Sequence, residues 1–341
     1  MSSGAWQAHC PMPEGLSTPK ESLSNRVSNA VRRSAAFRDV VSSAFRGLQA
    51  LGVSVTPVHF YFPVPNLKTL EASKWMPSDR PGINFDIPGA LSRLSRWMSY
   101  RDEWTFSHAD QPYNYHYNNG FFETVDAEVA YSIVREAKPA RIIEIGGGNS
   151  TRLLATALRK NALEEHPGTL ISIEPHPDPV LRKGFPGLTE LAMAHVQDMP
   201  LQIFDTLEAG DILFVDSSHV VSIGSDVVHE ILSILPRLKP GVIIHFHDIF
   251  LPAEYPKKFV MKNLCFWGEQ YMLEAFLSFN SKFRVLWGSS AMQFHQPEVL
   301  AAAFPQWPNS FAKMPEGLKI FAPTLDGEKV WPCSLWVVRQ G

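Results

Sequence analysis

Hydrophobic positions between about residue 120 and the end of the chain alternate between short apolar runs and longer helical patterns. Short runs rich in Val and Ile are typical of strands that are buried on both faces of a sheet. Strands are predicted at 141–145, 169–173, 191–196, 211–215, 241–246, 283–287 and 334–338. Helices are predicted at 125–137, 152–161, 222–235 and 268–279. This alternation predicts an α/β fold with a doubly wound, mostly parallel, seven-stranded sheet.

A change of pattern near residue 120 predicts two parts. Residues 1–120 hold helical signals separated by Pro- and aromatic-rich stretches, and we expect an accessory segment there that covers the substrate. Residues 121–341 then form the main domain, and 289–332 form an insertion before the last strand because they show little periodicity. Residues 23–51 carry apolar positions at helical spacing together with five arginines and one acid. This pattern favours an amphipathic accessory helix over a transit peptide or a membrane-surface helix.

Composition narrows the class of protein only a little. The chain is 45% hydrophobic and 19% charged, as is ordinary for a globular protein, and its net charge of −3 gives no electrostatic reason to expect nucleic acid as a partner. Three widely spaced cysteines make neither a disulfide framework nor a zinc ribbon, which favours a reducing cytoplasm. No apolar run approaches the length of a membrane span. A small-molecule substrate is expected, and a homo-oligomer is compatible with these features.

The segment that carries most chemistry is the glycine-rich turn after the first predicted strand. Glu144 lies inside that strand, Gly146, Gly147 and Gly148 form the turn, and Ser150 can cap the helix that follows. Glycines allow a tight turn and a close approach of a ligand to the backbone. The spacing differs from the G-x-G-x-x-G pattern of dinucleotide-binding folds, so a different nucleotide cofactor is expected.

Two further acids follow neighbouring strands. Glu174 ends the second predicted strand, where a carboxylate accepts hydrogen bonds from the ribose hydroxyls of an adenosine cofactor. Asp198 follows the third strand, where it is placed to contact an adenine amino group. Either acid alone is equally compatible with a helix cap or a surface charge. Their order along the chain makes a joint cofactor role the favoured interpretation.

The sequence Glu-x-Gly-Gly-Gly, followed by Glu174, Asp198 and Asp216, resembles the class I S-adenosylmethionine (SAM)-dependent methyltransferases over roughly residues 120–341. The resemblance implies that the three glycines line the methionine part of SAM, that Glu174 holds the ribose and that Asp198 holds the adenine. It also implies that residues 119–128 lead into an extra helix that covers the cofactor.

Two strand ends suggest a metal site. Asp216 and His219 follow the fourth strand, and His247 and Asp248 follow the fifth, so both acids are expected at one edge of the sheet. Converging carboxylates repel unless they are protonated or bridged by a cation such as Mg²⁺. The histidines favour Mn²⁺, Fe²⁺ or Zn²⁺ instead. Helix capping or cofactor contact without a metal is the alternative for the two acids, and His245 is expected to be a core histidine.

This region resembles the metal-dependent O-methyltransferases of the catechol and macrolide-sugar types, and also a widespread bacterial group of methyltransferase-like proteins. The Asp-x-x-His spacing of Asp216 and His219 matches the macrolide-sugar type and implies that His219 is the catalytic base, whereas the His247-Asp248 pair departs from the pattern of those enzymes. Two other functions stay open: a metal-dependent enzyme that does different chemistry on this fold, and a non-catalytic SAM-binding protein.

The acceptor is expected to be a small hydroxylated molecule such as a sugar or a phenol. Aromatic side chains with polar tips suit such an acceptor, although they suit a folded accessory segment equally well. The candidate contacts are His59, Tyr61, Tyr113, Tyr115, Tyr117, Glu254 and Tyr255.

Overall fold

The structure is a computed structural model that describes the chain apart from residues 1–34, 57–61, 71–74, 76 and 326–328. The chain divides into two compact units, Met1–Leu70 and Glu71–Gly341. The first unit contains helix α2 (Ala35–Ala50) and the short 3-10 helix η1 (Leu67–Thr69). Helix α2 falls within the predicted amphipathic segment 23–51, whose first part lies outside the described residues, as do His59 and Tyr61.

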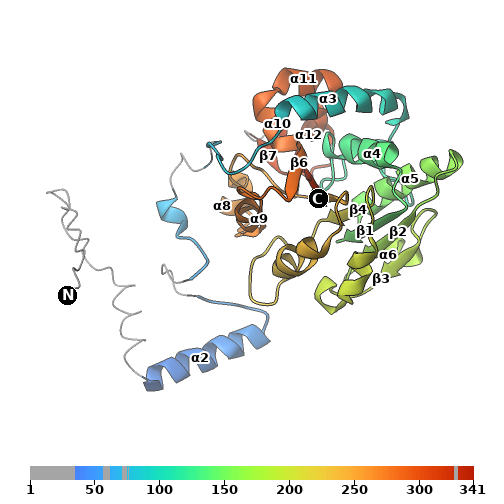
Figure 1. Ribbon diagram of the computed structural model, residues 1–341. Helices are drawn as coiled ribbons and strands as arrows, with labels where there is room; N and C mark the ends of the chain where they lie inside the picture. Colours follow the sequence, from blue (N-terminus) through green and yellow to red (C-terminus); the bar gives the residue numbers. More distant parts are fainter. Residues whose placement is uncertain (1–34, 57–61, 71–74, 76, 326–328) are drawn as a thin grey trace, which may run out of the picture. The chain divides into compact units, whose positions relative to one another are not determined.

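A seven-stranded sheet forms the centre of the second unit (Figure 1). Its strand order is β3-β2-β1-β4-β5-β9-β6, and only β9 runs antiparallel to its neighbours. The strands are β1 (Arg141–Ile145), β2 (Thr169–Ile173), β3 (Glu190–Ala192), β4 (Ile212–Val215), β5 (Ile243–Phe246), β6 (Phe283–Gly288) and β9 (Leu335–Arg339). The predicted fold class is therefore confirmed.

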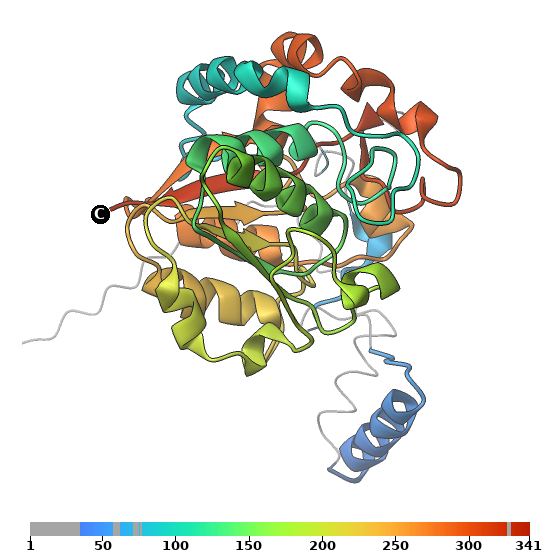
Figure 2. The same cartoon turned by 90° about the vertical axis from the view of Figure 1, so that its right-hand side faces the viewer.

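Helices cover both faces of the sheet (Figure 2). On one face, α3 (Ile87–Trp97), α4 (Asp126–Ala137) and α5 (Asn149–Leu163) contribute side chains to one hydrophobic core. On the other face, α7 (Asp226–His229) and α9 (Glu269–Leu277) contribute to a second core. Shorter helices are η3 (Met98–Glu103), α6 (Pro179–Lys183), η4 (Val196–Asp198), η5 (Leu201–Thr206) and α8 (Lys257–Met261). The sheet is thus buried on both sides, as its apolar strands require.

Three segments differ from the sequence-based expectations. The third strand ends at Ala192 rather than at 196, and η4 follows it. The helix predicted at 222–235 is split into α7, a π-helical turn η6 (Glu230–Ile234) and a 3-10 turn η7 (Leu235–Arg237). Pro236 explains part of this irregularity, because its ring clashes with the carbonyl four residues earlier in a regular helix.

The third difference is the predicted insertion at 289–332, about half of which is helical. It contains α10 (Ser289–His295), α11 (Pro297–Ala303), η8 (Trp307–Asn309) and α12 (Ser310–Lys313). A two-stranded ribbon of β7 (Thr324–Leu325) and β8 (Lys329–Val330) follows. Each helix is only one or two turns long, so periodicity over such short stretches gave no signal.

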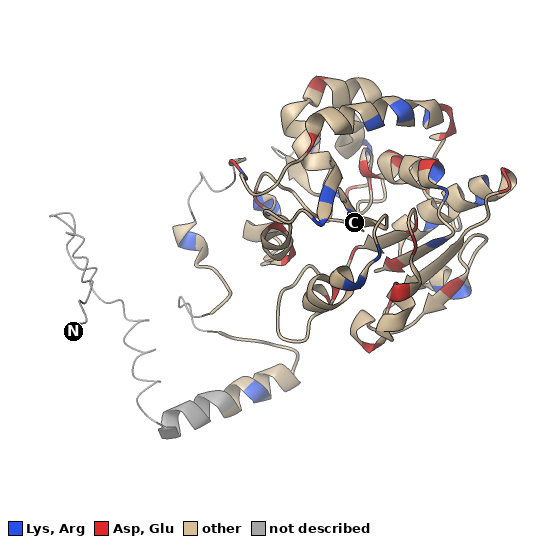
Figure 3. Ribbon diagram, viewed as in Figure 1, with Lys and Arg blue, Asp and Glu red and all other residues tan. Residues whose placement is uncertain are grey.

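The boundary of the accessory segment near residue 120 stays a prediction, and the two compact units divide at Leu70. Residues 87–97 form α3, and Ala90, Leu94 and Trp97 are buried in the core that also contains α4. Among the described residues, no helix is both long and apolar enough to cross a membrane. Figure 3 shows basic and acidic residues interspersed over helices and loops of the described chain.

Candidate functional site

The glycine turn at the end of β1 is built against the end of β4. Gly146 has a positive φ of 83°, and a Cβ at this position would lie 1.7 Å from the carbonyl oxygen of Asp216. The Gly146 amide donates a hydrogen bond of 3.0 Å to the carbonyl of Ile173 at the end of β2. Only glycine fits this position, because its neighbour is backbone that cannot move aside. The turn therefore joins the carboxyl ends of β1, β2 and β4.

Glu144 lies beneath the turn and holds the first residues of α5. Its side chain accepts hydrogen bonds from the hydroxyls of Ser150 and Thr151 at 2.8 and 2.6 Å. Burial of this fully enclosed carboxyl raises its pKa to about 7. The Thr151 hydroxyl in turn accepts from the Gly148 amide at 2.8 Å. Glu144 thus holds the turn in place through its hydrogen bonds to Ser150 and Thr151. It does not line the two cavities that open beside the turn.

Two adjoining cavities open beside the turn, with volumes of 270 and 380 Å³, and both are lined by Gly146, Glu174 and Asp216. Residues that line the first cavity alone include Phe121, Phe122, Gly147, Gly148, Asn149, Ser150 and Asp178. Residues that line the second alone include His176, His195, Gln197, Ser217 and Asp226. Most of the predicted cofactor residues therefore line these two cavities at the carboxyl edge of the sheet.

Glu174 and Asp198 occupy different positions relative to these cavities. The Glu174 carboxylate accepts hydrogen bonds from the amides of Gly147 at 3.1 Å and His176 at 2.6 Å, so it is fixed at the boundary of the two cavities. Asp198 is exposed and lines neither cavity, whereas Gln197 lines the second. The structure brings Glu174 to the glycine turn and leaves Asp198 outside the lining of both cavities.

The acids after β4 and β5 converge on one histidine. His219 Nε2 lies 3.6 Å from Asp216 Oδ1 and 3.5 Å from Asp248 Oδ2. On the other side of the ring, His219 Nδ1 is 2.7 Å from Glu269 Oε2. Burial by itself lowers the pKa of His219, but the hydrogen bond to Glu269 and the charges of the three acids outweigh it and raise the pKa to about 10. His219 is therefore an imidazolium ion enclosed by carboxylates.

The backbone holds His219 and Asp248 in uncommon conformations. Both residues have positive φ, 61° and 53° respectively, in the left-handed region that costs a non-glycine residue about 1 kcal/mol or more. The His219 carbonyl accepts hydrogen bonds from the amides of Gly268 and Glu269, which fixes the loop after β4 against the start of α9. The amide of Ile249 bonds to the Cys333 carbonyl and fixes the loop after β5.

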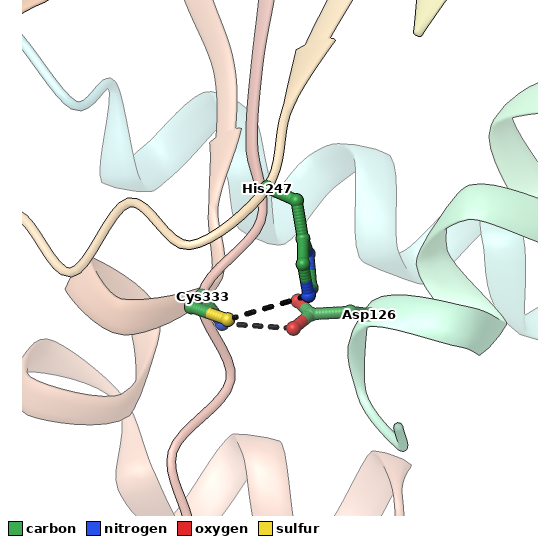
Figure 4. A group of neighbouring side chains, drawn as sticks. All are labelled: Asp126, His247 and Cys333. Atoms are coloured by element: carbon green, nitrogen blue, oxygen red, sulfur yellow. Dashed lines mark hydrogen bonds between the residues drawn. The ribbon is translucent and has the colours of Figure 1, made fainter. Parts of the chain in front are cut away.

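His247 lies beside Asp126 and Cys333 (Figure 4). Its Nε2 lies 3.8 Å from Cys333 Sγ, 4.0 Å from Asp248 Oδ1 and 3.2 Å from the Phe121 carbonyl oxygen. In the described chain, the ligand-type atoms that all lie within 4.8 Å of one another belong to Asp126, His247 and Cys333. The predicted metal residues Asp216, His219, His247 and Asp248 therefore split into two neighbouring groups that share Asp248.

Three residues of these groups carried no sequence signal that singled them out. Glu269 is the second residue of the predicted helix 268–279 and the first of α9, where an acid is ordinary. Cys333 immediately precedes the last strand, and Asp126 begins α4 more than two hundred residues earlier in the chain. Their partnership arises only when α4 and β9 are brought together, because Asp126 accepts hydrogen bonds from the amides of Cys333 and Ser334.

His245 is a core histidine, which agrees with its interpretation from the sequence. Its Nε2 is 2.9 Å from the Ser334 hydroxyl, and its ring stacks on Phe214 with 3.8 Å between the centroids. Burial lowers its pKa well below the ordinary value. A neutral imidazole at this position packs between β4 and β9 without facing the cavities.

A larger cavity of 1090 Å³ lies beyond Tyr255. Its lining contains four lysines and several aromatic rings, among them Lys257, Lys258, Phe294 and Trp331. Tyr255 packs edge-to-face on Trp267, and Trp267 contacts the ring of His219 with 4.5 Å between centroids. Ring contacts therefore run from Tyr255 in the wall of the cavity through Trp267 to His219.

The other candidate acceptor contacts have structural partners. Tyr115 and Tyr117 are buried, and their hydroxyls donate to the Phe122 carbonyl and to Glu128. Glu254 accepts a hydrogen bond from the Tyr271 hydroxyl, and Tyr113 is exposed. Of the described candidates, only Tyr255 lines the large cavity.

Comparisons with known proteins connect this architecture to a family. Residues 143–249 match a family model described as a methyltransferase domain. An uncharacterized protein of Archaeoglobus fulgidus is 32% identical over 171 residues, which cover 46% of this chain and 76% of the relative.

Solved structures similar to this chain include two O-methyltransferases. TomG from Streptomyces achromogenes, involved in tomaymycin synthesis and solved with SAM, is 15% identical with a TM-score of 0.37, covering 76% of this chain and 92% of that one. The O-methyltransferase from Bacillus cereus in complex with SAH is 15% identical with a TM-score of 0.32, covering 57% and 82% of the two chains.

Proposed function

This chain belongs to the class I SAM-dependent methyltransferases, and from that premise we propose that it methylates a hydroxyl oxygen of a small acceptor with the assistance of a divalent cation. One observation carries the proposal. The glycine turn, Glu174 and the pair Asp216 and His219 meet at one edge of the sheet, around adjoining cavities. SAM supplies a methyl group on a positively charged sulfur, so the protein mainly has to align the acceptor and take its proton.

The residues around the two cavities fit an adenosyl cofactor. Gly148 has no atom within 4 Å of the position that a Cβ would take, so this part of the turn is open to a ligand. Glu174 offers a carboxylate at the boundary of the cavities, suited to the two ribose hydroxyls. We place the methionine part in the first cavity and the adenine in the second. In the second cavity Gln197, rather than the neighbouring Asp198, is the residue that would contact the adenine.

The donor set beside the cavities fits a hard divalent cation such as Mg²⁺ or Mn²⁺. Asp216 and Asp248 present oxygens toward the same imidazole nitrogen of His219, and no Lys or Arg of the described chain forms an ion pair with either acid. Carboxylate oxygens are the ligands such ions prefer. When bound, the ion would supply Lewis acidity that lowers the pKa of an acceptor hydroxyl. His247 lies outside this group and next to Cys333.

His219 is proposed as the base that receives the acceptor proton at Nε2. Glu269 holds the opposite nitrogen, which fixes the tautomer and the orientation of the ring. Without a cation the surrounding acids keep His219 protonated, because its pKa is raised to about 10. A cation held by Asp216 and Asp248 opposes that effect, so cation binding and release of the His219 proton are linked.

The acceptor is proposed to approach from the side of Tyr255. The large cavity has aromatic walls and lysine side chains, which suit a ring-containing molecule with an anionic or hydroxylated part. Trp267 lies between that cavity and His219, and its ring is the surface on which the reacting end of the acceptor would rest.

Titration calorimetry of the full chain with SAM tests the cofactor part of the proposal. Loss of a hydrogen-bonding carboxylate in Glu174→Ala should weaken SAM binding by about 10- to 100-fold. Glu190→Ala is the matched control, since Glu190 is exposed on β3 and lines neither cavity. Absence of any heat with SAM for the wild-type protein would contradict the proposal.

A methyl-transfer assay tests the cation part. Release of S-adenosylhomocysteine is measured with phenols and sugars as acceptors, with added Mg²⁺ or Mn²⁺ and with excess chelator. Asp216→Ala and Asp248→Ala should each abolish turnover, as should the chelator. If both variants retain full turnover in the chelator, the cation has no part in the reaction.

A further inference from the structure

Three buried potential ligands from three separate parts of the chain lie within 4.8 Å of one another, and Asp248 contacts two of them. Asp126 begins α4, His247 follows β5 and Cys333 precedes β9 (Figure 4), and Asp248 is the next residue after His247. The side chains of Asp126, His247 and Cys333 are at most 4% exposed. This group contains a thiol, which distinguishes its chemistry from the oxygen-rich pair of Asp216 and Asp248.

The distances within the group match those between ligands of one metal ion. Cys333 Sγ is 3.2 Å from Asp248 Oδ1 and 3.8 Å from His247 Nε2, and those last two atoms are 4.0 Å apart. Tetrahedral Zn²⁺ with its usual bond lengths separates sulfur, nitrogen and oxygen ligands by about 3.3 to 3.6 Å. The two distances to Cys333 Sγ therefore need an adjustment of at most about 0.4 Å, and the distance between His247 and Asp248 one of about 0.6 Å. Asp126 offers an oxygen within 4.8 Å of the His247 and Cys333 ligand atoms.

The electrostatics of the group also favour a cation. Asp248 lies 3.5 Å from the His219 ring and Asp126 accepts two backbone hydrogen bonds, but in the described chain neither acid forms an ion pair with Lys or Arg. Burying charge is costly unless the charge is paired or coordinates a metal. The Cys333 thiol donates a hydrogen bond to Asp248, and His247 Nε2 lies 3.2 Å from the Phe121 carbonyl oxygen. A metal ion would replace the thiol proton and take the place of the Phe121 contact.

Asp248 lies between this group and His219. Its Oδ1 faces Cys333 and His247, whereas its Oδ2 faces His219. The two oxygens of the Asp248 carboxylate can therefore bind two different metal ions. The thiol-containing position is also rigid, because Asp126 accepts hydrogen bonds from the Cys333 and Ser334 amides at 2.8 and 3.1 Å.

We propose that Cys333, His247 and Oδ1 of Asp248, completed by Asp126, form a buried site for a thiophilic divalent metal such as Zn²⁺. Thiolate and imidazole ligands select Zn²⁺, Fe²⁺ and Co²⁺ over Mg²⁺. This inference is independent of methyl transfer. It predicts a metal position that remains when the cation between Asp216 and Asp248 Oδ2 is absent. Its role is structural, since it ties α4 and β9 to the end of β5.

Cobalt substitution of the full chain tests the site directly. Protein treated with chelator and then with one equivalent of Co²⁺ should develop the near-ultraviolet thiolate-to-cobalt charge-transfer absorption and the visible bands of tetrahedral cobalt. Zn²⁺ should abolish both signals by displacement, and a large excess of Mg²⁺ should leave them unchanged. Absence of the charge-transfer absorption in the wild-type protein would overturn the proposal without reliance on any variant.

Variants test whether the charge-transfer absorption comes from Cys333. Cys333→Ser should remove the charge-transfer absorption and weaken Co²⁺ binding by more than about 100-fold, since even the loss of an outer-shell partner costs 10- to 100-fold. Cys265→Ser, the matched control at the other described cysteine, should retain the absorption. Asp216→Asn should also retain it, because Asp216 belongs to the other side of Asp248. A signal that survives in folded Cys333→Ser, or that disappears in Cys265→Ser, contradicts the assignment.

Discussion

His219 and Asp248 show how the site depends on backbone conformation as much as on side-chain chemistry. Both residues have positive φ, and both are held there by hydrogen bonds from other segments. Histidine and aspartate adopt this conformation more readily than bulky or β-branched residues do. The loops after β4 and β5 consequently turn their side chains toward each other above the sheet edge.

The glycine turn gives a prediction at the scale of single residues. Gly146→Ala should lower the free energy of unfolding by at least about 2 kcal/mol, because its Cβ would meet the Asp216 carbonyl oxygen and its φ is positive. Gly148→Ala should change stability by less than about 0.5 kcal/mol, since its φ of 175° is extended and its surroundings are open. Urea denaturation measures both.

The same pair of variants separates folding from cofactor binding. Gly148 lines the first cavity, so a methyl group there should weaken SAM binding in calorimetry while the protein stays folded. Equal loss of stability in both variants would show that the turn is not packed against β4 as described.

Glu269 provides a second prediction at this scale. Glu269→Gln keeps the size of the side chain but weakens its hydrogen bond to His219 Nδ1, so turnover should fall by about 10- to 100-fold. SAM affinity should be unchanged, because Glu269 lines neither cofactor cavity. Glu274→Gln, on the same helix but paired with Arg80, serves as the control. A parallel fall of SAM affinity would indicate disruption of the fold rather than loss of an orienting carboxylate.

The site residues at the ends of strands could be predicted from the sequence, whereas residues that contact partners far away in the chain could not. Gly146, Glu174, Asp216 and Asp248 each directly follow a recognisable buried strand or lie within its turn. Glu269 contacts His219 across 50 positions of the chain, and Asp126 contacts Cys333 across 207 positions. No local sequence pattern predicts such pairs, because each residue is of a common type for its own segment.

At the scale of elements, the strands were predictable because burial on both faces leaves a continuous apolar signature. β1 and β2 have the bounds expected from the sequence, and β4, β5, β6 and β9 differ by one or two residues. The short helices between Ser289 and Lys313 were not predictable, since one or two turns cannot establish a period. Tertiary packing, including the burial of Trp307, determines their position.

Arg135 on α4 gives a prediction about how the helices are joined. It is 2% exposed and pairs with Glu103 on η3 and with Glu164 after α5, two acids that are partly exposed. Arg135→Ala should lower the free energy of unfolding by about 2 to 4 kcal/mol, because it leaves partners of a buried ion-pair group uncompensated. Arg96→Ala removes an exposed pair with Glu136 and should cost less than about 1 kcal/mol.

Thermal and urea denaturation of the two arginine variants provide the measurement. Equal effects at the two positions would mean that burial of Arg135 does not strengthen its ion pairs.

At the scale of the whole molecule, stability is expected to depend on buried acids. Glu123, Glu128 and Glu144 each have a pKa raised to about 7, chiefly because burial disfavours the carboxylate. The unfolded chain releases these protons near pH 4.5, so the folded state binds more protons between about pH 4.5 and 7. These acids therefore contribute stability that is lost as the pH rises through that window.

A single substitution isolates one of these contributions. Glu144→Gln removes the ionisation but keeps the shape of the side chain, so the variant should lose less stability than the wild type between pH 5 and pH 8. The difference should reach at most about 3 kcal/mol for a shift of this size. Urea midpoints at constant ionic strength measure it. Parallel curves for the two proteins would mean that Glu144 is already ionised at pH 5 in the folded state.

The position of β9 has a consequence for folding during synthesis. β6 pairs with β9 and with no other strand of the described chain, yet about fifty residues separate the two strands. A nascent chain that has completed β6 must hold an unpaired strand until β9 emerges and enters between β5 and β6. We expect the part of the sheet from β3 to β5 to form during translation. Strands β9 and β6 should then add to the sheet together in one late step.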